Sequence, residues 1–176
     1  LDACRRRSVR VVHTPDANTQ AVVELVAAFA LDALRPRAFL DRALPLPEWK
    51  AARNALIAPR QLGDITVGVL GFGRIGKRVA RVFESFGCRV LYHDVAEIPP
   101  VEHLRARSVP FETLLHESDL LTIHVDERSS NRGLIAAPRL ALMKPDATLI
   151  NTSRGFVVHA GDLAAWRRGG EVARWR

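Results

Sequence analysis

The chain has 176 residues, of which 48% are hydrophobic, enough for one domain with a core of its own. Its formal net charge of +7 comes from basic residues, nearly all arginine, that are scattered along the sequence, so we expect no nucleic-acid partner. The two cysteines form no Cys-x-x-Cys pair; this argues against a disulfide framework or zinc site and favours a metal-free, cytoplasmic protein. The longest apolar region, residues 21–34, carries Glu24 and Asp32, so no membrane span is expected.

The first third of the chain contains one strong helical pattern. Residues 1–8 read as the end of a helix and residues 9–12 as a strand, which a turn at residues 13–16 then ends. Asn18 or Thr19 can cap the following helix, which we predict to run to about Arg35 before Pro36 ends it. Residues 38–62 hold three prolines and scattered charges, which predict a covering helix or arm. Its apolar side chains either meet a partner subunit or cover the domain's own core.

The most informative stretch is residues 65–94. Residues 65–70 form a nearly continuous apolar run, typical of a strand buried on both faces of a parallel sheet. The run leads directly into Gly71, Gly73 and Gly76, spaced as Gly-x-Gly-x-x-Gly. We expect the first glycine to permit a tight turn, the second to let a pyrophosphate approach the backbone, and the third to allow close packing of helix on strand.

A helix and a second strand complete this unit. Apolar residues recur at helical spacing from Ile75 to Phe86, and Gly87 stands where a helix usually stops. The strand at residues 88–92 leads to Asp94, roughly 20 residues beyond Gly76, the separation expected of the acid that binds an adenosine ribose. This carboxylate would repel a 2′-phosphate, so the predicted cofactor is NAD. The alternatives are a glycine turn that only packs a helix on a sheet, and a solvated aspartate at a strand end.

The remainder of the chain alternates helices with strands. We predict a weak helix at residues 102–107, helices at 111–117 and 136–143, strands at 120–125 and 147–151, and a last helix opened by Gly161 or Asp162 and closed by Gly169 and Gly170. Such alternation indicates βαβ units, and the predicted fold class is α/β: a doubly wound parallel sheet, a Rossmann-like NAD-binding domain.

Ligands of open α/β sheets bind beyond the carboxyl ends of the strands. This rule makes candidates of the glycine loop, of Asp94, and of the segments 124–126 and 151–155. Arg154 is of particular interest because a guanidinium offers a carboxylate a planar, permanently charged fork. In so arginine-rich a chain, the alternative is an ordinary solvated side chain.

Four segments together resemble the D-isomer-specific 2-hydroxyacid dehydrogenases. They are HTPDAN at 13–18, GFGRIG at 71–76, the run 118–135, and MKPDATLINTSRG at 143–155. The resemblance implies an NAD enzyme that interconverts a 2-hydroxy acid and a 2-oxo acid by hydride transfer. It assigns Arg154 to catalysis, gripping the substrate carboxylate and polarising its carbonyl. The cofactor residues that it implies are Gly71, Gly73, Arg74, Ile75 and Gly76 at the pyrophosphate, Asp94 at the ribose, His124 and Val125 beside the cofactor, and Thr152 and Ser153 near the nicotinamide ribose.

The sequence also departs from the family. A glutamate and a histidine, the general acid/base, follow downstream in the family, and most of a substrate-binding domain precedes. We therefore expect residues 1–16 to be a remnant of that domain, residues 17–176 to be an incomplete NAD-binding domain, and turnover by this chain alone to be poor. Asp126 stands where proline is usual, and His159 where an acid is common.

Other functions remain open at this point. The chain could be a non-catalytic NAD-sensing dimerisation module, like the co-repressors that share the family's fold. We expect a homodimer, or a partner chain that supplies the missing lobe. The substrate class, hydroxy acid against formate or phosphite, is left undecided.

Overall fold

The computed structural model describes residues 2–35, 37–57 and 60–169, and its centre is a parallel sheet of five strands in the order β3-β2-β1-β4-β5. The strands are β1 (Thr66–Leu70), β2 (Arg89–His93), β3 (Arg107–Ser108), β4 (Leu120–Ile123) and β5 (Thr148–Asn151). The chain starts the sheet in its middle, adds strands on one side as far as β3, and then returns to add β4 and β5 on the other. The point of reversal therefore lies between β1 and β4, where ligands of such sheets bind.

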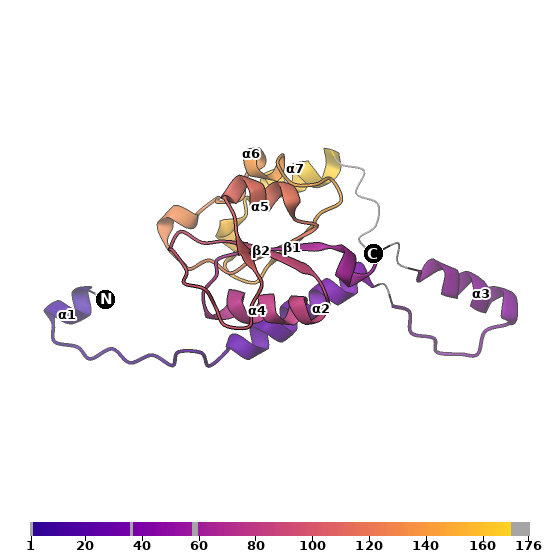
Figure 1. The fold of residues 1–176 in the computed structure, drawn as a ribbon, viewed down its shortest axis with the longest axis horizontal. Helices are drawn as coiled ribbons and strands as arrows, with labels where there is room; N and C mark the ends of the chain where they lie inside the picture. The colour runs from indigo at the N-terminus through magenta and orange to yellow at the C-terminus, as the bar shows by residue number, and fades with distance from the viewer. Residues whose placement is uncertain (1, 36, 58–59, 170–176) are drawn as a thin grey trace.

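Helices cover both faces of the sheet, as Figure 1 shows. The helices are α1 (Asp2–Arg6), α2 (Thr19–Leu34), α3 (Leu46–Ala55), α4 (Arg74–Ser85), α5 (Phe111–Glu117), α6 (Ala137–Leu140) and α7 (Ala160–Gly169), with 3-10 turns η1 (Leu62–Asp64), η2 (Ser129–Asn131) and η3 (Gly155–Val157). The pair α2 and α4 lies on one face, and α5, α6 and α7 lie on the other. The doubly wound α/β fold predicted from the sequence is confirmed.

Strand β1 contributes to a separate core on each face. Val67 and Val69 pack with residues of α2 and α4, such as Val26 and Phe83. Leu70 packs on the other side, in the cluster that contains Leu114 and Leu121. Because successive side chains of a strand point to opposite faces, burial on both sides explains why the run reads as continuously apolar.

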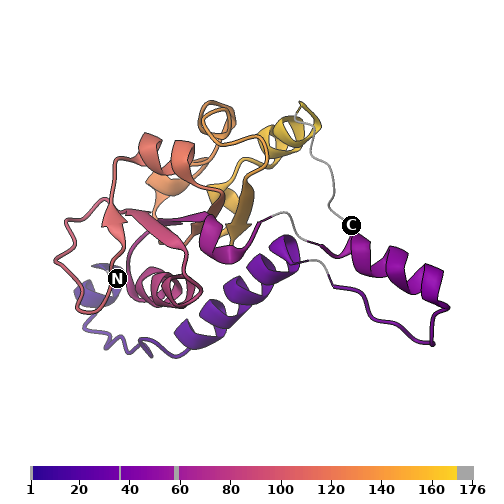
Figure 2. The same cartoon turned by 45° about the vertical axis from the view of Figure 1, so that its right-hand side comes forward.

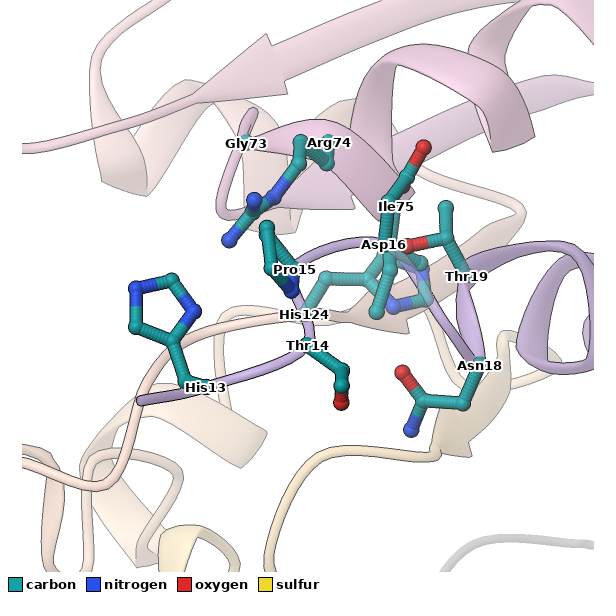
Figure 3. A pocket seen from close by; sticks show the side chains of 10 residues that line it. All are labelled: His13, Thr14, Pro15, Asp16, Asn18, Thr19, Gly73, Arg74, Ile75 and His124. Atoms are coloured by element: carbon teal, nitrogen blue, oxygen red, sulfur yellow. The ribbon is translucent and has the colours of Figure 1, made fainter. Parts of the chain in front are cut away.

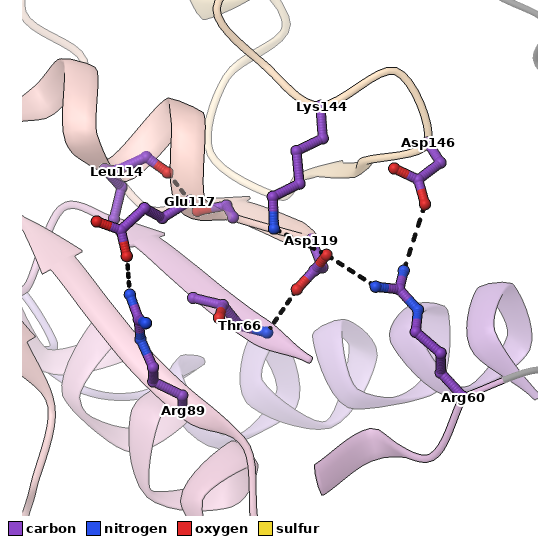
Figure 4. A network of polar contacts seen from close by, with 9 residues as sticks. Arg60, Thr66, Arg89, Leu114, Glu117, Asp119, Lys144 and Asp146 are labelled. Carbon is purple, nitrogen blue, oxygen red and sulfur yellow. Dashed lines mark hydrogen bonds and ion pairs between the residues drawn. The ribbon is translucent and has the colours of Figure 1, made fainter. Parts of the chain in front are cut away.

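The amino ends of the strands are tied together by the buried carboxylate of Asp119 (Figure 4). Asp119 accepts hydrogen bonds from the backbone N–H of Thr66 at 2.8 Å, from Arg60 at 2.9 Å and from Lys144 at 3.0 Å. Burial alone would raise its pKa, but these three donors outweigh that effect and leave the pKa below its usual value. The cluster lies at the end of the sheet opposite the glycine loop, so its role is structural.

Two elements predicted from the sequence are wrong. Residues 9–12 form no strand: Val9, Val11 and Val12 are 55%, 49% and 74% exposed, and no strand of the described chain pairs with them. Residues 102–107 form a turn that leads into β3 instead of a helix. His103 there has φ of 57°, which a right-handed helix does not allow.

The other predicted elements are confirmed with small shifts at their ends. Helix α6 covers only the middle of residues 136–143, and α7 begins at Ala160. The predicted stop at Gly170 lies outside the described residues. The arm expected at residues 38–62 contains α3, which projects from the body in both Figure 1 and Figure 2.

Candidate functional site

The glycine loop joins β1 to α4, and two of its glycines are sterically obligatory. Gly71 has φ of 91°, and a Cβ atom there would lie 2.8 Å from the backbone carbon and oxygen of His124. A Cβ on Gly76 would lie 2.2 Å from the carbonyl oxygen of Gly71. No side chain larger than hydrogen fits at either position, which agrees with the roles expected for the first and third glycines.

Gly73 is different, because a Cβ atom there would meet no protein atom within 4 Å. The residue precedes Arg74, the first residue of α4, and no side chain caps the helix. The first N–H groups of a helix have no partner within it, and together with the helix dipole they favour an anion. No acidic residue occupies the first turn of α4. The space beside Gly73 is therefore open and suited to a phosphate group.

Asp94 follows β2 and is bonded to the glycine loop. Its carboxylate accepts hydrogen bonds from the backbone N–H of Phe72 at 2.6 Å and of Ala96 at 2.9 Å, one on each oxygen. A carboxylate oxygen can accept more than one hydrogen bond, so both oxygens keep capacity for hydroxyl donors. Asp94 is half-buried at the rim of the sheet, where the sequence placed it.

His124 follows β4 and lies beneath the glycine loop. Its imidazole Nε2 lies 2.9 Å from the hydroxyl of Thr122, and Nδ1 lies 3.4 Å from the hydroxyl of Thr152. Burial lowers its pKa to about 4, so the ring is neutral at physiological pH. No carboxylate of the described residues bonds to the ring, and a general base needs such an orienting partner as well as a pKa near the working pH.

A pocket of about 290 Å³ opens between the glycine loop and the N-terminal segment (Figure 3). Gly73, Arg74, Ile75 and His124 line one side of it. The other side comes from residues 13–19, which the sequence indicated as a turn, a helix cap and part of a family motif but not as site residues: His13, Thr14, Pro15, Asp16, Asn18 and Thr19. Four of the predicted site residues are thus brought together around one cavity.

Asp16 fastens the N-terminal side of this pocket to α4. Its carboxylate lies 2.5 Å from the guanidinium of Arg78. A hydrogen bond from Thr19 and the charges of Arg78 and Arg74 lower the pKa of Asp16, so it is ionised throughout the physiological range. The pairing holds residues 13–19 beside the start of the helix.

Arg154 lies in the loop after β5 and is exposed, but it is not an isolated cation. Its Nε donates to Glu127 at 3.0 Å, and its Nη1 donates to the carbonyl oxygen of Ser153 at 3.1 Å. One hydrogen of Nη1 and both of Nη2 remain free, so the end of the guanidinium can still grip a carboxylate through two nitrogens. Sequence reasoning missed Glu127, because its relation to Arg154 arises only where the loops after β4 and β5 meet.

The neighbours of Arg154 are ordered by side-chain bonds. Asn151 accepts hydrogen bonds from the backbone N–H of Ser153 at 3.0 Å and from its hydroxyl at 2.7 Å. Thr152 contacts His124, and Val125 is half-buried beside it. The loops after β4 and β5 therefore form a continuous rim next to the glycine loop.

A second pocket, of about 220 Å³, is lined by aliphatic and aromatic residues. It lies between the stacked rings of Phe72 and Tyr92, whose centroids are 3.7 Å apart, and the loop after β2. The remaining lining residues are Ile98, Pro99, Pro100, Val101, Leu104 and Ala106. No pattern in the sequence predicted this pocket, whose outer side comes from the non-helical residues 98–106.

The described residues 2–35, 37–57 and 60–169 contain no group of three or more histidine, cysteine, aspartate or glutamate side chains that could hold a metal ion. None of their helices has the length and apolar character that crossing a membrane requires.

The sequence of this chain matches those of known proteins. Residues 27–175 match the family described as D-isomer specific 2-hydroxyacid dehydrogenase, NAD binding domain. The chain is 36% identical to a glyoxylate reductase of Aeropyrum pernix, over 98% of this chain and 53% of that protein. It is 34% identical to a glyoxylate reductase of Thermococcus litoralis, over 98% of this chain and 54% of that protein. The chain thus spans about half the length of these curated relatives.

Solved structures of similar proteins include complexes with the cofactor. A D-lactate dehydrogenase from Lactobacillus jensenii with NAD+ is 28% identical, with a TM-score of 0.77, over 96% of this chain and 50% of that chain. A D-lactate dehydrogenase from Aquifex aeolicus, complexed with NAD and lactic acid, is 31% identical, with a TM-score of 0.79, over 96% of this chain and 50% of that chain.

Proposed function

Because the chain belongs to the D-isomer specific 2-hydroxyacid dehydrogenase family, as its NAD-binding domain, we propose that it serves hydride transfer between NAD and a small 2-hydroxy or 2-oxo acid. NAD supplies the hydride acceptor of such a reaction. The observation that carries the proposal is the arrangement of the open glycine loop, Asp94 and Arg154 beyond the carboxyl ends of β1, β2 and β5. One extended ligand can reach all three.

The pyrophosphate of NAD is proposed to lie against Gly73, Arg74 and Ile75. The open space at Gly73 and the uncapped start of α4 support this placement. Gly71 and Gly76 serve it indirectly, because they bring the helix start close to the strand. The free acceptor capacity of Asp94 supports its role as the partner of the adenosine ribose hydroxyls.

The nicotinamide end is proposed to lie over His124, Val125, Thr152 and Ser153. His124 acts there as a neutral hydrogen-bonding group, since its lowered pKa leaves it uncharged at physiological pH. It is a cofactor-side residue in this proposal and not the general acid/base.

Arg154 is proposed to bind the substrate carboxylate and polarise the neighbouring carbonyl. Its free Nη1 and Nη2 hydrogens support a bidentate grip. Glu127 fixes the opposite side of the guanidinium, so the fork is oriented before the substrate arrives. The preorganised positive charge then stabilises negative charge that develops on the carbonyl oxygen as the hydride is delivered.

The domain division is a further part of the proposal. Residues 1–16 belong to a substrate-binding domain, and residues 17–176 to the NAD-binding domain. The position of residues 13–16 along one side of the 290 Å³ pocket supports this boundary, because a cleft between two domains would pass there.

The partner proposed for the apolar surface is a second copy of the chain. Helix α2 exposes Leu25 and Phe29 at 44% and 47% on its outer side. The projecting arm exposes Phe39, Leu40, Leu46, Trp49 and Ile57. Apolar side chains gathered on a projecting segment are typical of an interface. Light scattering should give a dimer mass that Phe29→Glu lowers and that Phe86→Glu, at the exposed residue directly after α4, leaves unchanged. A monomer mass for the wild type would contradict the proposal.

Titration of the purified chain with NADH, followed by nicotinamide fluorescence, tests the cofactor proposal. We expect saturable binding with a Kd below about 1 mM, which corresponds to roughly 4 kcal/mol. An absence of binding at that concentration would contradict it.

The hydride-transfer step is tested on the whole protein, where Arg154→Gln should reduce kcat/KM for a 2-oxo acid while leaving NADH affinity unchanged.

A further inference from the structure

The loop after β4 carries a preorganised arginine that no part of the proposed function uses. Arg128 donates to the carboxylate of Asp126 through Nε at 2.7 Å and through Nη2 at 2.5 Å. Asn131 holds the same aspartate, with its side-chain amide 3.0 Å from the backbone oxygen and 3.0 Å from Oδ1. The guanidinium is therefore fixed in a planar fork by a partner that is itself fixed.

The sheet places Arg128 and Asp94 on opposite sides of the glycine loop. Strands β2 and β4 both pair with β1, and His93 and Ile123 stand level with Leu70. Asp94 follows β2 and Arg128 follows β4. The ends of these two strands are separated by two strand spacings, roughly 10 Å. A long arginine side chain can span much of that distance.

Both aspartates favour the charged form of Arg128. The carboxylate of Asp126 is the main cause of a raised pKa at Arg128, and the charge of Asp94 adds to it. Among the hydrogen bonds of the described residues, none joins Arg128 to Asp94. The rim at the adenosine end of the proposed cofactor site thus carries an anion and a cation that are not bonded to each other.

The three residues directly after Asp94 bring no competing cation. The residues that follow Asp94 are Val95, Ala96 and Glu97. Arg128 still has both hydrogens of Nη1 and one hydrogen of Nη2 free. These donors suit a phosphate group, whereas the carboxylate of Asp94 suits hydroxyl groups and repels a phosphate.

We propose that Arg128, held by Asp126, is a latent subsite for a ribose 2′-phosphate, and that Asp94 alone keeps the site selective for NAD. The proposal rests on the proposed function, since it requires a dinucleotide whose adenosine ribose lies beside Asp94. It follows that a single substitution at Asp94 turns the preference of the site from NADH to NADPH.

The test is calorimetric titration of the chain with NADH and with NADPH. Asp94→Ser removes the negative charge and keeps a short oxygen near the N–H of Phe72. We expect wild type to bind NADH at least about tenfold more tightly than NADPH, and Asp94→Ser to reverse the ratio, since one charged hydrogen bond is worth about tenfold. Adding Arg128→Gln to that variant should abolish the gain for NADPH. Arg132→Gln, in the same loop and stacked on Phe156, is the matched control and should change nothing.

The outcomes separate this inference from the proposed function. Wild type that binds neither nucleotide would overturn both. Two results would overturn only the inference, provided that wild type binds NADH. One is an Asp94→Ser variant whose affinity for NADPH does not rise; the other is a rise in that affinity that persists when Arg128→Gln is added. Arg128→Gln alone provides a readout that does not depend on the folding of the Asp94 variant. It should weaken NADPH binding about tenfold more than NADH binding, and equal effects on the two would again overturn the inference.

Discussion

Alanine at Gly73 should weaken cofactor binding without harming the fold, whereas alanine at Gly71 should harm the fold. A methyl group on Gly73 meets no protein atom within 4 Å, and the residue has an extended backbone with a negative φ of −75°. Substitutions at such positions usually change the free energy of unfolding by no more than about 0.5 kcal/mol. The methyl group would occupy the space proposed for the pyrophosphate. Loss of one charge-assisted bond to a phosphate, about 1.5–3 kcal/mol, weakens NADH binding by about tenfold to a hundredfold.

Gly71→Ala provides the contrast within the same loop. Its φ of 91° costs a side-chain-bearing residue about 1–2 kcal/mol, and the new Cβ would lie 2.8 Å from the backbone of His124. A loss of about 2 kcal/mol lowers the melting temperature of a domain of this size by roughly 4–8 °C. Thermal unfolding and NADH titration of both variants check the prediction. The reasoning is refuted if Gly73→Ala retains wild-type affinity for NADH, or if it loses as much stability as Gly71→Ala.

Three further predictions concern other groups. Asp119→Ala should lower the free energy of unfolding in urea by about 1–3 kcal/mol, since the backbone N–H of Thr66 and two cations lose their buried acceptor, and leave NADH affinity unchanged. His124 has a pKa lowered to about 4 in the folded state, so the unfolded chain binds more protons and stability should fall as the pH drops from about 6.5 to 4. A matching melting profile in His124→Gln would contradict this. In the whole protein, Glu127→Gln should raise kcat/KM for oxaloacetate severalfold relative to glyoxylate, because Glu127 is 3.0 Å from Arg154 and repels a second anionic group. An unchanged ratio would exclude that effect.

The βαβ unit around the glycine loop could be predicted from the sequence because its signals are local. The apolar run before Gly71, the helical spacing up to Phe86 and the stop at Gly87 each act within a few residues of the element that they define. The rule that ligands bind at strand ends then named Asp94 and Arg154 without any coordinates. Both lie on the rim, as expected.

The errors and omissions arise from contacts between distant parts of the chain. Residues 9–12 have the β-branched pattern of a strand but find no partner in the described chain, and pairing, not propensity, makes a strand. The approach of residues 13–19 to the glycine loop includes an ion pair between Asp16 and Arg78, which are far apart in sequence. The ion pair of Glu127 with Arg154 likewise exists only after β4 and β5 have paired.

The most direct measurement of the central claim is the change in backbone amide resonances of the isotope-labelled chain as NAD is added. The account predicts that the largest changes fall on Gly73, Arg74 and Ile75, with further changes at Asp94 and Val125. Residues of α3 and of the cluster around Asp119, which lie away from the rim, should not respond. A spectrum that does not change, or changes confined to the surface away from the glycine loop, would contradict the placement of a dinucleotide on this rim.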